Sequence, residues 1–156
     1  MLKVAVITVS DRAYRGEYED LSGPKIKQMI EESGIEAKVS LILVPDERKA
    51  ITEGLVKNLD KDIILTTGGT GISPRDITPD VTRKVCDKEV PGISEYLRQE
   101  SLKETKNAVF SRGFSGIKDK TIIINLPGSV KAVTLCTKLL VPVLEHGKKM
   151  FLGGRH

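Results

Sequence analysis

A glycine-rich run in the middle of the chain has residue types that suit anion binding. Gly68, Gly69 and Gly71 lack a Cβ atom, so their backbone N–H groups can approach an anion closely. Thr67 and Thr70 add hydroxyl donors to the same run. The run is not followed by Gly-Lys-Ser/Thr and is not a Gly-x-Gly-x-x-Gly pattern, so neither of the commonest nucleotide fingerprints applies. It predicts a phosphate-binding loop, and a tight turn after a strand is the alternative interpretation.

Three further segments, each placed after an apolar run, offer acids or small residues. They are Ser10-Asp11-Arg12, Pro45-Asp46-Glu47 and Pro127-Gly128-Ser129. Ser129 stands where the last helix should begin, and the free N–H groups of a helix N-terminus attract anions. An ordinary helix N-cap is the alternative role for Ser129, and the two roles are compatible. With the glycine run, these segments contain the parts needed to hold phosphates and a cation.

The segments around these loops alternate between strand-like and helix-like patterns. β-Branched apolar runs predict strands at residues 2–9, 37–44, 62–66 and 121–126. Apolar residues three and four apart predict helices from Ser22 to Gly34, over 47–59, 80–86 and 93–103, and from Ser129 onward. We expect Pro142 to kink the last helix or end its first part, and the polar residues 111–120 to form a turn between two strands.

This alternation is typical of an α/β fold with a mostly parallel sheet and helices on both of its faces. In such sheets, ligands bind outside the carboxyl ends of the strands. All four loops follow predicted strands, so their anion-binding elements should converge in one pocket.

Composition limits the class of protein. The chain has 156 residues, 39% of them hydrophobic and 29% charged, which predicts one folded domain over residues 1–156. Its net charge of +4 is too small and too evenly spread to indicate nucleic-acid binding. We find no apolar run of transmembrane length and no signal-peptide layout, so we expect a cytoplasmic protein without membrane contact. Cys86 and Cys136 lie too far apart for a metal motif and should be buried, inert thiols.

The stretch TTGGTGISPRDITPD, residues 66–80, resembles the signature of the molybdenum-cofactor biosynthesis domain that the MogA and MoaB proteins share. Relatives include plant and animal proteins that insert molybdenum, and the G domain of gephyrin. The segments SDRAYRGEYED, VPDER, KEVPGISEYLR and NLPGSVKAV also look familial and occur in the family's order. The resemblance covers nearly the entire chain and is closest to the MogA type.

The resemblance implies a three-layer α/β/α sandwich, usually assembled as a homotrimer. It also implies an ATP- and Mg²⁺-dependent nucleotidyltransferase, in which the molybdopterin phosphate attacks the α-phosphate of ATP and releases pyrophosphate. Family enzymes use two aspartates, which here match Asp46 and Asp76, and we expect both to be catalytic ligands of Mg²⁺. The alternatives are a helix N-cap for Asp46 and an ion pair with Arg75 for Asp76. Asp80 is interpreted as structural, in the first turn of a helix.

The remaining loop residues are assigned from their chemistry and their positions after the strands. Ser10 and Asp11 are expected to line the molybdopterin pocket, and Arg12 to pair with its phosphate or to be a solvated surface residue. The phosphates of ATP are assigned to the glycine run and the start of the last helix, namely Thr67, Gly68, Gly69, Thr70, Gly71, Pro127, Gly128 and Ser129.

Three other functions were weighed. A MoaB-type protein would bind molybdopterin without adenylylating it, but the members that do so lack the acid that this chain has as Asp46. A non-catalytic assembly module, as in gephyrin, finds no support in a chain without linkers or further modules. A nucleic-acid binder would need a basic stripe and stacking aromatics. A downstream molybdenum insertase is a possible partner.

Overall fold

Strands and helices alternate along the chain, as the sequence patterns predict. The computed structural model describes residues 1–151 and 153. Its strands are β1 (Leu2–Val9), β2 (Ala37–Val44), β3 (Ile63–Thr67), β4 (Lys88–Glu89), β5 (Ser115–Lys118) and β6 (Thr121–Leu126). Its helices are α1 (Asp11–Tyr14), α2 (Ser22–Glu32), α3 (Arg48–Val56), α4 (Thr78–Val85), α5 (Pro91–Leu102), the 3₁₀ helix η1 (Lys106–Phe110) and α6 (Val130–Phe151).

The strands form one sheet in the order β2-β1-β3-β6-β5-β4. β1 pairs in parallel with β2 and β3, and β3 pairs in parallel with β6. β5 and β4 extend the sheet with antiparallel pairs. The prediction of a mostly parallel sheet is confirmed.

The register places the carboxyl ends of the parallel strands level with one another. Val9, the last residue of β1, lies opposite Val44, the last residue of β2. Thr67 at the end of β3 lies opposite Thr8 on one side and Leu126, the end of β6, on the other. The loops that follow all four strands therefore leave the sheet at the same edge.

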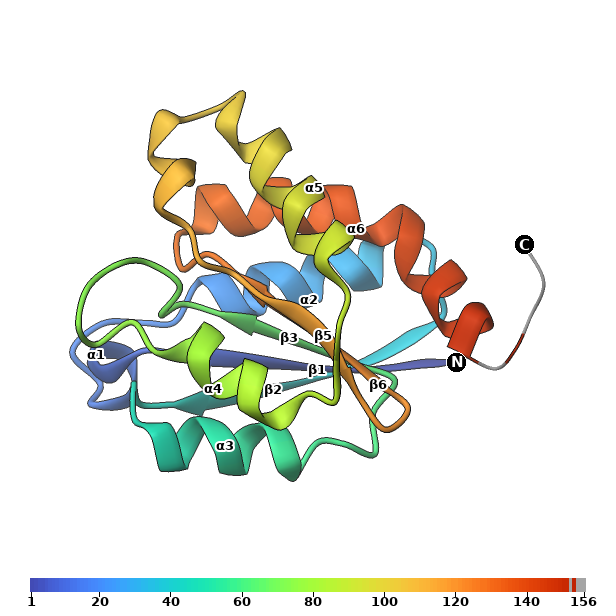
Figure 1. Ribbon diagram of the computed structural model, residues 1–156, viewed down its shortest axis with the longest axis horizontal. Coiled ribbons are helices and arrows are strands. Elements are labelled where there is room, and N and C mark those ends of the chain that lie inside the picture. The colour runs from blue at the N-terminus through green and yellow to red at the C-terminus, as the bar shows by residue number, and fades with distance from the viewer. Residues whose placement is uncertain (152, 154–156) are drawn as a thin grey trace.

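Helices cover both faces of the sheet, so the molecule has three layers (Figure 1). Alternate residues of the strands point to opposite faces. Val4 and Val6 of β1 belong to one core with residues of α2, α5 and α6, whereas Ala5 and Ile7 belong to a second core with residues of α3 and α4. The predicted α/β/α sandwich is confirmed.

The order of the strands reverses at β1, and this locates the natural binding edge. α2 connects β1 to β2 over one face, and α3 connects β2 to β3 over the other face. β1 and β3 are therefore neighbours whose chains depart to opposite faces, which opens a crevice between their carboxyl ends.

One expectation about the elements is wrong, and one of the two alternatives for Pro142 is excluded. Residues 111–120 contain the short strand β5, which forms a hairpin with β6 around Asp119, a residue with φ of 52°. Helix α6 contains Pro142 and continues to Phe151, so the proline does not end it. Pro142 lacks an N–H group, and the helix tolerates the loss of one backbone hydrogen bond there.

The cysteines fit the interpretation of inert thiols. Cys86 and Cys136 are both free. Burial raises the pKa of the Cys86 thiol to about 11, and burial likewise raises the pKa of Cys136. In the described part of the chain, no helix has the length and apolar character needed to span a membrane.

Candidate active site

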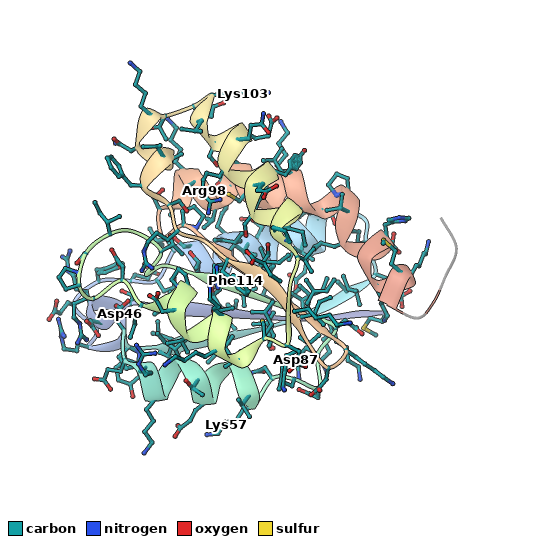
Figure 2. The ribbon with its side chains drawn as sticks, viewed as in Figure 1. Asp46, Lys57, Asp87, Arg98, Lys103 and Phe114 are labelled. Carbon is teal, nitrogen blue, oxygen red and sulfur yellow. The ribbon has the colours of Figure 1, made fainter. Side chains whose placement is uncertain are left out.

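A cavity of about 470 Å³ opens at the carboxyl ends of β1, β3 and β6, beside the loop that follows β2. Figure 2 labels Asp46 at this end of the sheet. Residues from all four predicted loops line the cavity: Ser10, Asp46, Thr67, Gly68, Gly69, Asp76, Gly128 and Ser129. The expected convergence of these loops is therefore present in the structure.

The other predicted phosphate-binding residues line a second cavity of about 260 Å³. This cavity lies on the α5 side of the same turn, and its walls include Thr70, Gly71 and Pro127. Ser129 lines both cavities. The predicted single pocket is thus two cavities that meet at the start of α6.

The first two glycines of the run are required by its backbone conformation. Gly68 and Gly69 have φ values of 101° and 68°, which L side chains rarely adopt. A Cβ atom on Gly68 would clash with the carbonyl oxygen of Val9, and one on Gly69 would clash with Oγ1 of Thr78. The loop thereby packs closely against β1 and α4.

The loop's donors divide into two groups. The N–H of Gly68 donates to the carbonyl oxygen of Leu126 (3.1 Å), so it fixes the loop to the end of β6. The N–H groups of Gly69, Thr70 and Gly71 find no acceptor among the described residues. The second group is therefore available to bind an anion.

Asp46 exchanges hydrogen bonds with Asp11 across the crevice. The N–H of Asp11 donates to Oδ2 of Asp46, and the N–H of Asp46 donates to Oδ1 of Asp11, both at 2.9 Å. The N-cap position of α3 is occupied by Glu47, so the alternative role of Asp46 as a helix cap does not apply. Partial burial raises the pKa of Asp46 despite the bond from Asp11. Oδ1 of Asp46 has no donor among the described residues.

Arg75 binds Asp11 rather than Asp76. Its Nη2 and Nε atoms lie 2.7 and 3.0 Å from Oδ2 of Asp11. Burial of Asp11 acts to raise its pKa, but the hydrogen bonds from Arg75 and the N–H of Asp46, together with the charges of Arg75 and Arg15, outweigh it and lower the pKa. The alternative in which Asp76 forms an ion pair with Arg75 is therefore wrong.

Asp76 lies in a tight turn of the loop between β3 and α4. Its Oδ2 accepts a hydrogen bond from the N–H of Ser73 (3.0 Å), and its own N–H donates to the carbonyl of Ser73 (2.9 Å). A Cβ atom on Gly71 would lie 2.8 Å from Oδ2 of Asp76, so the absence of a side chain there leaves room for the carboxylate.

Ser10 precedes the short helix α1, and Arg12 lies within it. Ser10 caps this helix by accepting from the N–H of Ala13 (3.2 Å), and its hydroxyl lies 3.0 Å from the hydroxyl of Tyr18. The Arg12 side chain is 70% exposed; it lies 3.7 Å from Glu17 and over the ring of Tyr18. Ser10 thus lines the cavity, whereas Arg12 lies at the surface beside it.

The turn after β6 presents its N–H groups as donors. The hydroxyls of Thr67 and Ser22 donate to the carbonyl oxygens of Pro127 and Gly128, both at 2.7 Å. The two groups of a trans peptide point in opposite directions, so the N–H groups of Gly128 and Ser129 face away from these hydroxyls. Neither finds an acceptor in the described structure. Ser129 also caps α6 by accepting from the N–H of Ala132 (3.1 Å), so both of its expected roles are compatible with the geometry.

The structure adds residues that the sequence analysis missed. Asp20 lines the larger cavity and accepts from the hydroxyl of Thr8 (2.7 Å) and the N–H of Gly23 (3.2 Å). Tyr18 and Ser22 line the same cavity. Arg112 contacts the loop that carries Asp76 from a distant part of the chain. The acids of SDRAYRGEYED were a signal for Asp20, whereas nothing in the sequence pattern pointed to Arg112.

Comparison with known proteins identifies the class of this domain. A family profile described as "Probable molybdopterin binding domain" matches residues 5–146. The molybdopterin adenylyltransferase of Helicobacter pylori (strain J99) is 40% identical over 156 residues, which cover 97% of this chain and 89% of that protein. The chain is 44% identical to the molybdenum cofactor synthesis protein cinnamon of Drosophila melanogaster, but spans only 24% of its length.

The fold agrees with these matches. The crystal structure of the molybdopterin biosynthesis enzyme MoaB from Thermus thermophilus superposes with a TM-score of 0.90, at 40% identity and over 98% of both chains. The chain therefore belongs to the molybdopterin-binding domain family of molybdenum cofactor biosynthesis, as its glycine run and flanking segments predict.

Proposed function

We propose that this protein is a molybdopterin adenylyltransferase. In this reaction a phosphate oxygen of molybdopterin attacks the α-phosphorus of ATP, and the bond from that phosphorus to the β-phosphate bridging oxygen breaks. AMP stays on molybdopterin, and pyrophosphate leaves. The observation that carries the proposal is the pair of carboxylates, Asp46 and Asp76, on one cavity with free backbone donors. The relative from Helicobacter pylori, 40% identical, bears the name of this activity.

The two carboxylates fit a magnesium ion. Mg²⁺ takes oxygen ligands and is commonly held by one or two carboxylates, with phosphate oxygens and waters completing its shell. Asp46 and Asp76 each keep one oxygen without a donor among the described residues. Among the described residues, no group of three or more His, Cys, Asp or Glu side chains could hold a metal ion. When bound, Mg²⁺ would neutralise charge between the two polyanionic reactants.

Backbone donors supply the remaining anion binding. The N–H groups of Gly69 to Gly71 and of Gly128 and Ser129 bind phosphates of ATP, with the dipole of α6 adding to the second set. Ser10 forms part of the molybdopterin wall, and Arg12 reaches a phosphate from the surface. Asp11 acts on the site indirectly, because its backbone N–H holds the carboxylate of Asp46 in place. Because Ser129 borders both cavities, we place the two reactants on either side of it.

A MoaB-type protein that binds molybdopterin without adenylylating it is the second candidate, since a MoaB structure is so similar. Asp46 favours the enzyme, because its free oxygen and its place beside Gly69 leave it ready to hold a cation. The test is to incubate the protein with molybdopterin, ATP and Mg²⁺, with EDTA in a parallel sample. We expect adenylylated molybdopterin and pyrophosphate in the Mg²⁺ sample alone. Tight molybdopterin binding without any product would favour the second candidate.

We further propose a homotrimer in the cytoplasm that passes its product to a molybdenum insertase. An apolar cavity of about 440 Å³ beside the second half of α6 supports self-association. Its lining includes Ile117, Ile122, Val143 and Met150, and Val143 is 48% exposed. Exposed apolar patches of this kind commonly mark protein interfaces.

A further inference from the structure

The loop between β3 and α4 carries Asp76, and one of its own side chains, Arg75, ties it to Asp11 of α1. Asp76 and Ser73 exchange hydrogen bonds that form a local turn. At the tip of the loop, Ile72 is 68% exposed. The N–H of Thr78 donates to the carbonyl of Gly69 (3.2 Å) and closes the base of the loop. These bonds shape the loop, and the pair between Arg75 and Asp11 holds it through a side chain rather than through the backbone of its turn.

Arg112, which lies between η1 and β5, adds a connection to the backbone of the loop. Its backbone N–H donates to the carbonyl of Thr70 (2.8 Å), and its Nε donates to the carbonyl of Gly71 (2.9 Å). Its Nη2 donates to the carbonyl of Asp76 (2.5 Å). One arginine therefore binds the start of the loop and the residue that bears the proposed metal ligand.

The charge of Arg112 is neutralised by another residue. Its Nη1 and Nη2 atoms each lie 3.0 Å from an oxygen of Asp80 in the first turn of α4. This fork-shaped pair raises the pKa of Arg112 and lowers that of Asp80. Because Asp80 takes the charge, the guanidinium touches Asp76 only at its backbone carbonyl. The carboxylate of Asp76 is left free to bind a cation.

Arg112 is itself held in place from α5. The Nε and Nη2 atoms of Arg98 donate to the carbonyl oxygens of Ser111 and Gly113, both at 2.8 Å. These two residues flank Arg112 in the chain. Figure 2 labels Arg98 on the helical layer that packs on one face of the sheet. A continuous path of hydrogen bonds thus runs from α5 through Arg112 to Asp76.

We propose that Arg112 is a positioning residue for adenylyl transfer: it holds the backbone of Asp76 so that the carboxylate faces the cavity, while Asp80 keeps the guanidinium from pairing with that carboxylate. This inference rests on the proposed function. A lysine could not replace Arg112, because a single ammonium cannot bind two carbonyls and both oxygens of a carboxylate at once.

The test compares Arg112→Ala, Arg112→Lys and Asp80→Asn with Arg83→Ala as the matched control. Arg83 also lies near Asp80 on α4, but it pairs with Glu89 at 3.4 Å and has no hydrogen bond to the loop. The readout is the Mg²⁺ concentration that gives half the maximal rate. We expect it to rise about tenfold or more in both Arg112 variants, as for the loss of a charge-assisted hydrogen bond, and to rise also in Asp80→Asn. Arg83→Ala should match the wild type.

Guanidinium ion, added below denaturing concentrations, should lower the Mg²⁺ concentration that gives half the maximal rate of Arg112→Ala, part of the way back to the wild-type value. Folded Arg112 variants with the wild-type Mg²⁺ dependence would overturn the inference. If circular dichroism shows that Arg112→Ala is unfolded, the Mg²⁺ dependence of Arg112→Lys and Asp80→Asn tests the inference instead. A wild-type Mg²⁺ dependence in both would overturn it. If the wild type forms no product, the proposed function fails on its own. Calorimetric titration of Mg²⁺-dependent ATP binding in the same variants then tests the positioning role.

Discussion

At the scale of single residues, the oxygens of Asp46 have separate tasks. Oδ2 accepts from Asp11 and ties the loop after β2 to the end of β1. Oδ1 lies on the side of Gly69, where an added Cβ would be 3.1 Å from it. A carboxylate held by one oxygen and free at the other is pre-organised to bind a cation, and pre-organisation lowers the cost of positioning charged reactants.

Asp46→Asn and Asp76→Asn should each lower the rate of adenylylation by about 100-fold or more, because the charge that binds the cation is lost. An asparagine oxygen can still accept the bond from Asp11 or Ser73, so the fold should persist. Rates are measured at saturating Mg²⁺, with circular dichroism as the check on folding. Wild-type rates in both variants would exclude the metal-ligand role.

The raised pKa of Asp46 predicts a pH dependence of Mg²⁺ binding. Protons compete with the cation for this carboxylate, so Mg²⁺ affinity is complete above its pKa and falls as the pH drops through it. Since burial raises the pKa, the fall should begin at a higher pH than for a solvated aspartate. Mg²⁺-dependent ATP binding, titrated from neutral pH downward, checks this. If Mg²⁺-dependent ATP binding by Asp46→Asn declines over the same pH range, another group is responsible for the pH dependence.

Gly69→Val should weaken ATP binding strongly, because a β-branched side chain disfavours a φ of 68° and would meet Thr78. We also expect a loss of about 1–3 kcal/mol in the free energy of unfolding. Gly92→Ala is the control, since a Cβ atom there would meet nothing within 4 Å. Calorimetric titration and thermal melting measure both effects. A folded Gly69→Val protein with normal ATP affinity would show that the loop is only a turn.

The sequence predicted which loop residues come together at the edge of the sheet, but not which hydrogen bonds and ion pairs they form there. Asp46 and Asp76 follow parallel strands of one sheet, so their convergence follows from the strand pattern. Arg75 was considered as a partner of its neighbour Asp76 but binds Asp11, which is 64 positions away. Arg112 reaches Asp76 across 36 positions. Such contacts depend on loop conformations that hydrophobic periodicity does not encode.

At the scale of elements, Ser129 at the start of α6 caps the helix and also lies where an anion is expected to bind. Ser129 caps the helix through its hydroxyl and borders both cavities. Aspartate is also a good N-cap residue, so a Ser129→Asp variant should keep the helix. The substitution therefore tests the charge at this point without removing the cap.

Ser129→Asp should bind molybdopterin about 5- to 150-fold more weakly than Ser129→Ala, which corresponds to ~1–3 kcal/mol of repulsion in a partly buried site. The difference should shrink as salt is added, because screening weakens the repulsion. Equilibrium binding across a salt series measures it. Equal affinity of the two variants at low salt would mean that the phosphate of molybdopterin does not lie near Ser129.

Among the elements that the sequence patterns missed, β5 has poor strand-forming residues. It reads Ser-Gly-Ile-Lys, and a Cβ atom on Gly116 would lie 2.6 Å from the carbonyl of Lys88. The strand forms because β6 and β4 pair with it on both sides, and the glycine allows their close approach. The observed bounds of the long strands β1, β2 and β6 match the predicted ones. Their apolar, β-branched side chains identify them as strands.

At the scale of the whole molecule, the two ends of the sheet have different surfaces. The carboxyl ends of the parallel strands carry the cavity lined by Asp46 and Asp76, whereas the second half of α6, with β5 and β6, borders the apolar cavity. An apolar surface away from the candidate active site suits an interface that leaves the site open. The single domain over residues 1–156 stays a prediction.

Val143→Glu should convert the proposed trimer to a smaller species, because it places a charge on the apolar cavity. Val56→Glu is the control, since Val56 is 51% exposed on α3, which covers the opposite face of the sheet. Light scattering coupled to size-exclusion chromatography gives the mass of each species. A monomeric wild type would contradict the trimer, and an unchanged Val143→Glu mass would exclude this surface as its interface.

The central claim is transfer of AMP to molybdopterin, and the fate of the α-phosphorus tests it most directly. ATP labelled at that atom is incubated with the protein, molybdopterin and Mg²⁺, and the products are separated. We expect label in the pterin product, with one pyrophosphate released for each labelled molecule. Label that remains in ATP, or appears only in free AMP, while molybdopterin stays bound and unmodified, would contradict it.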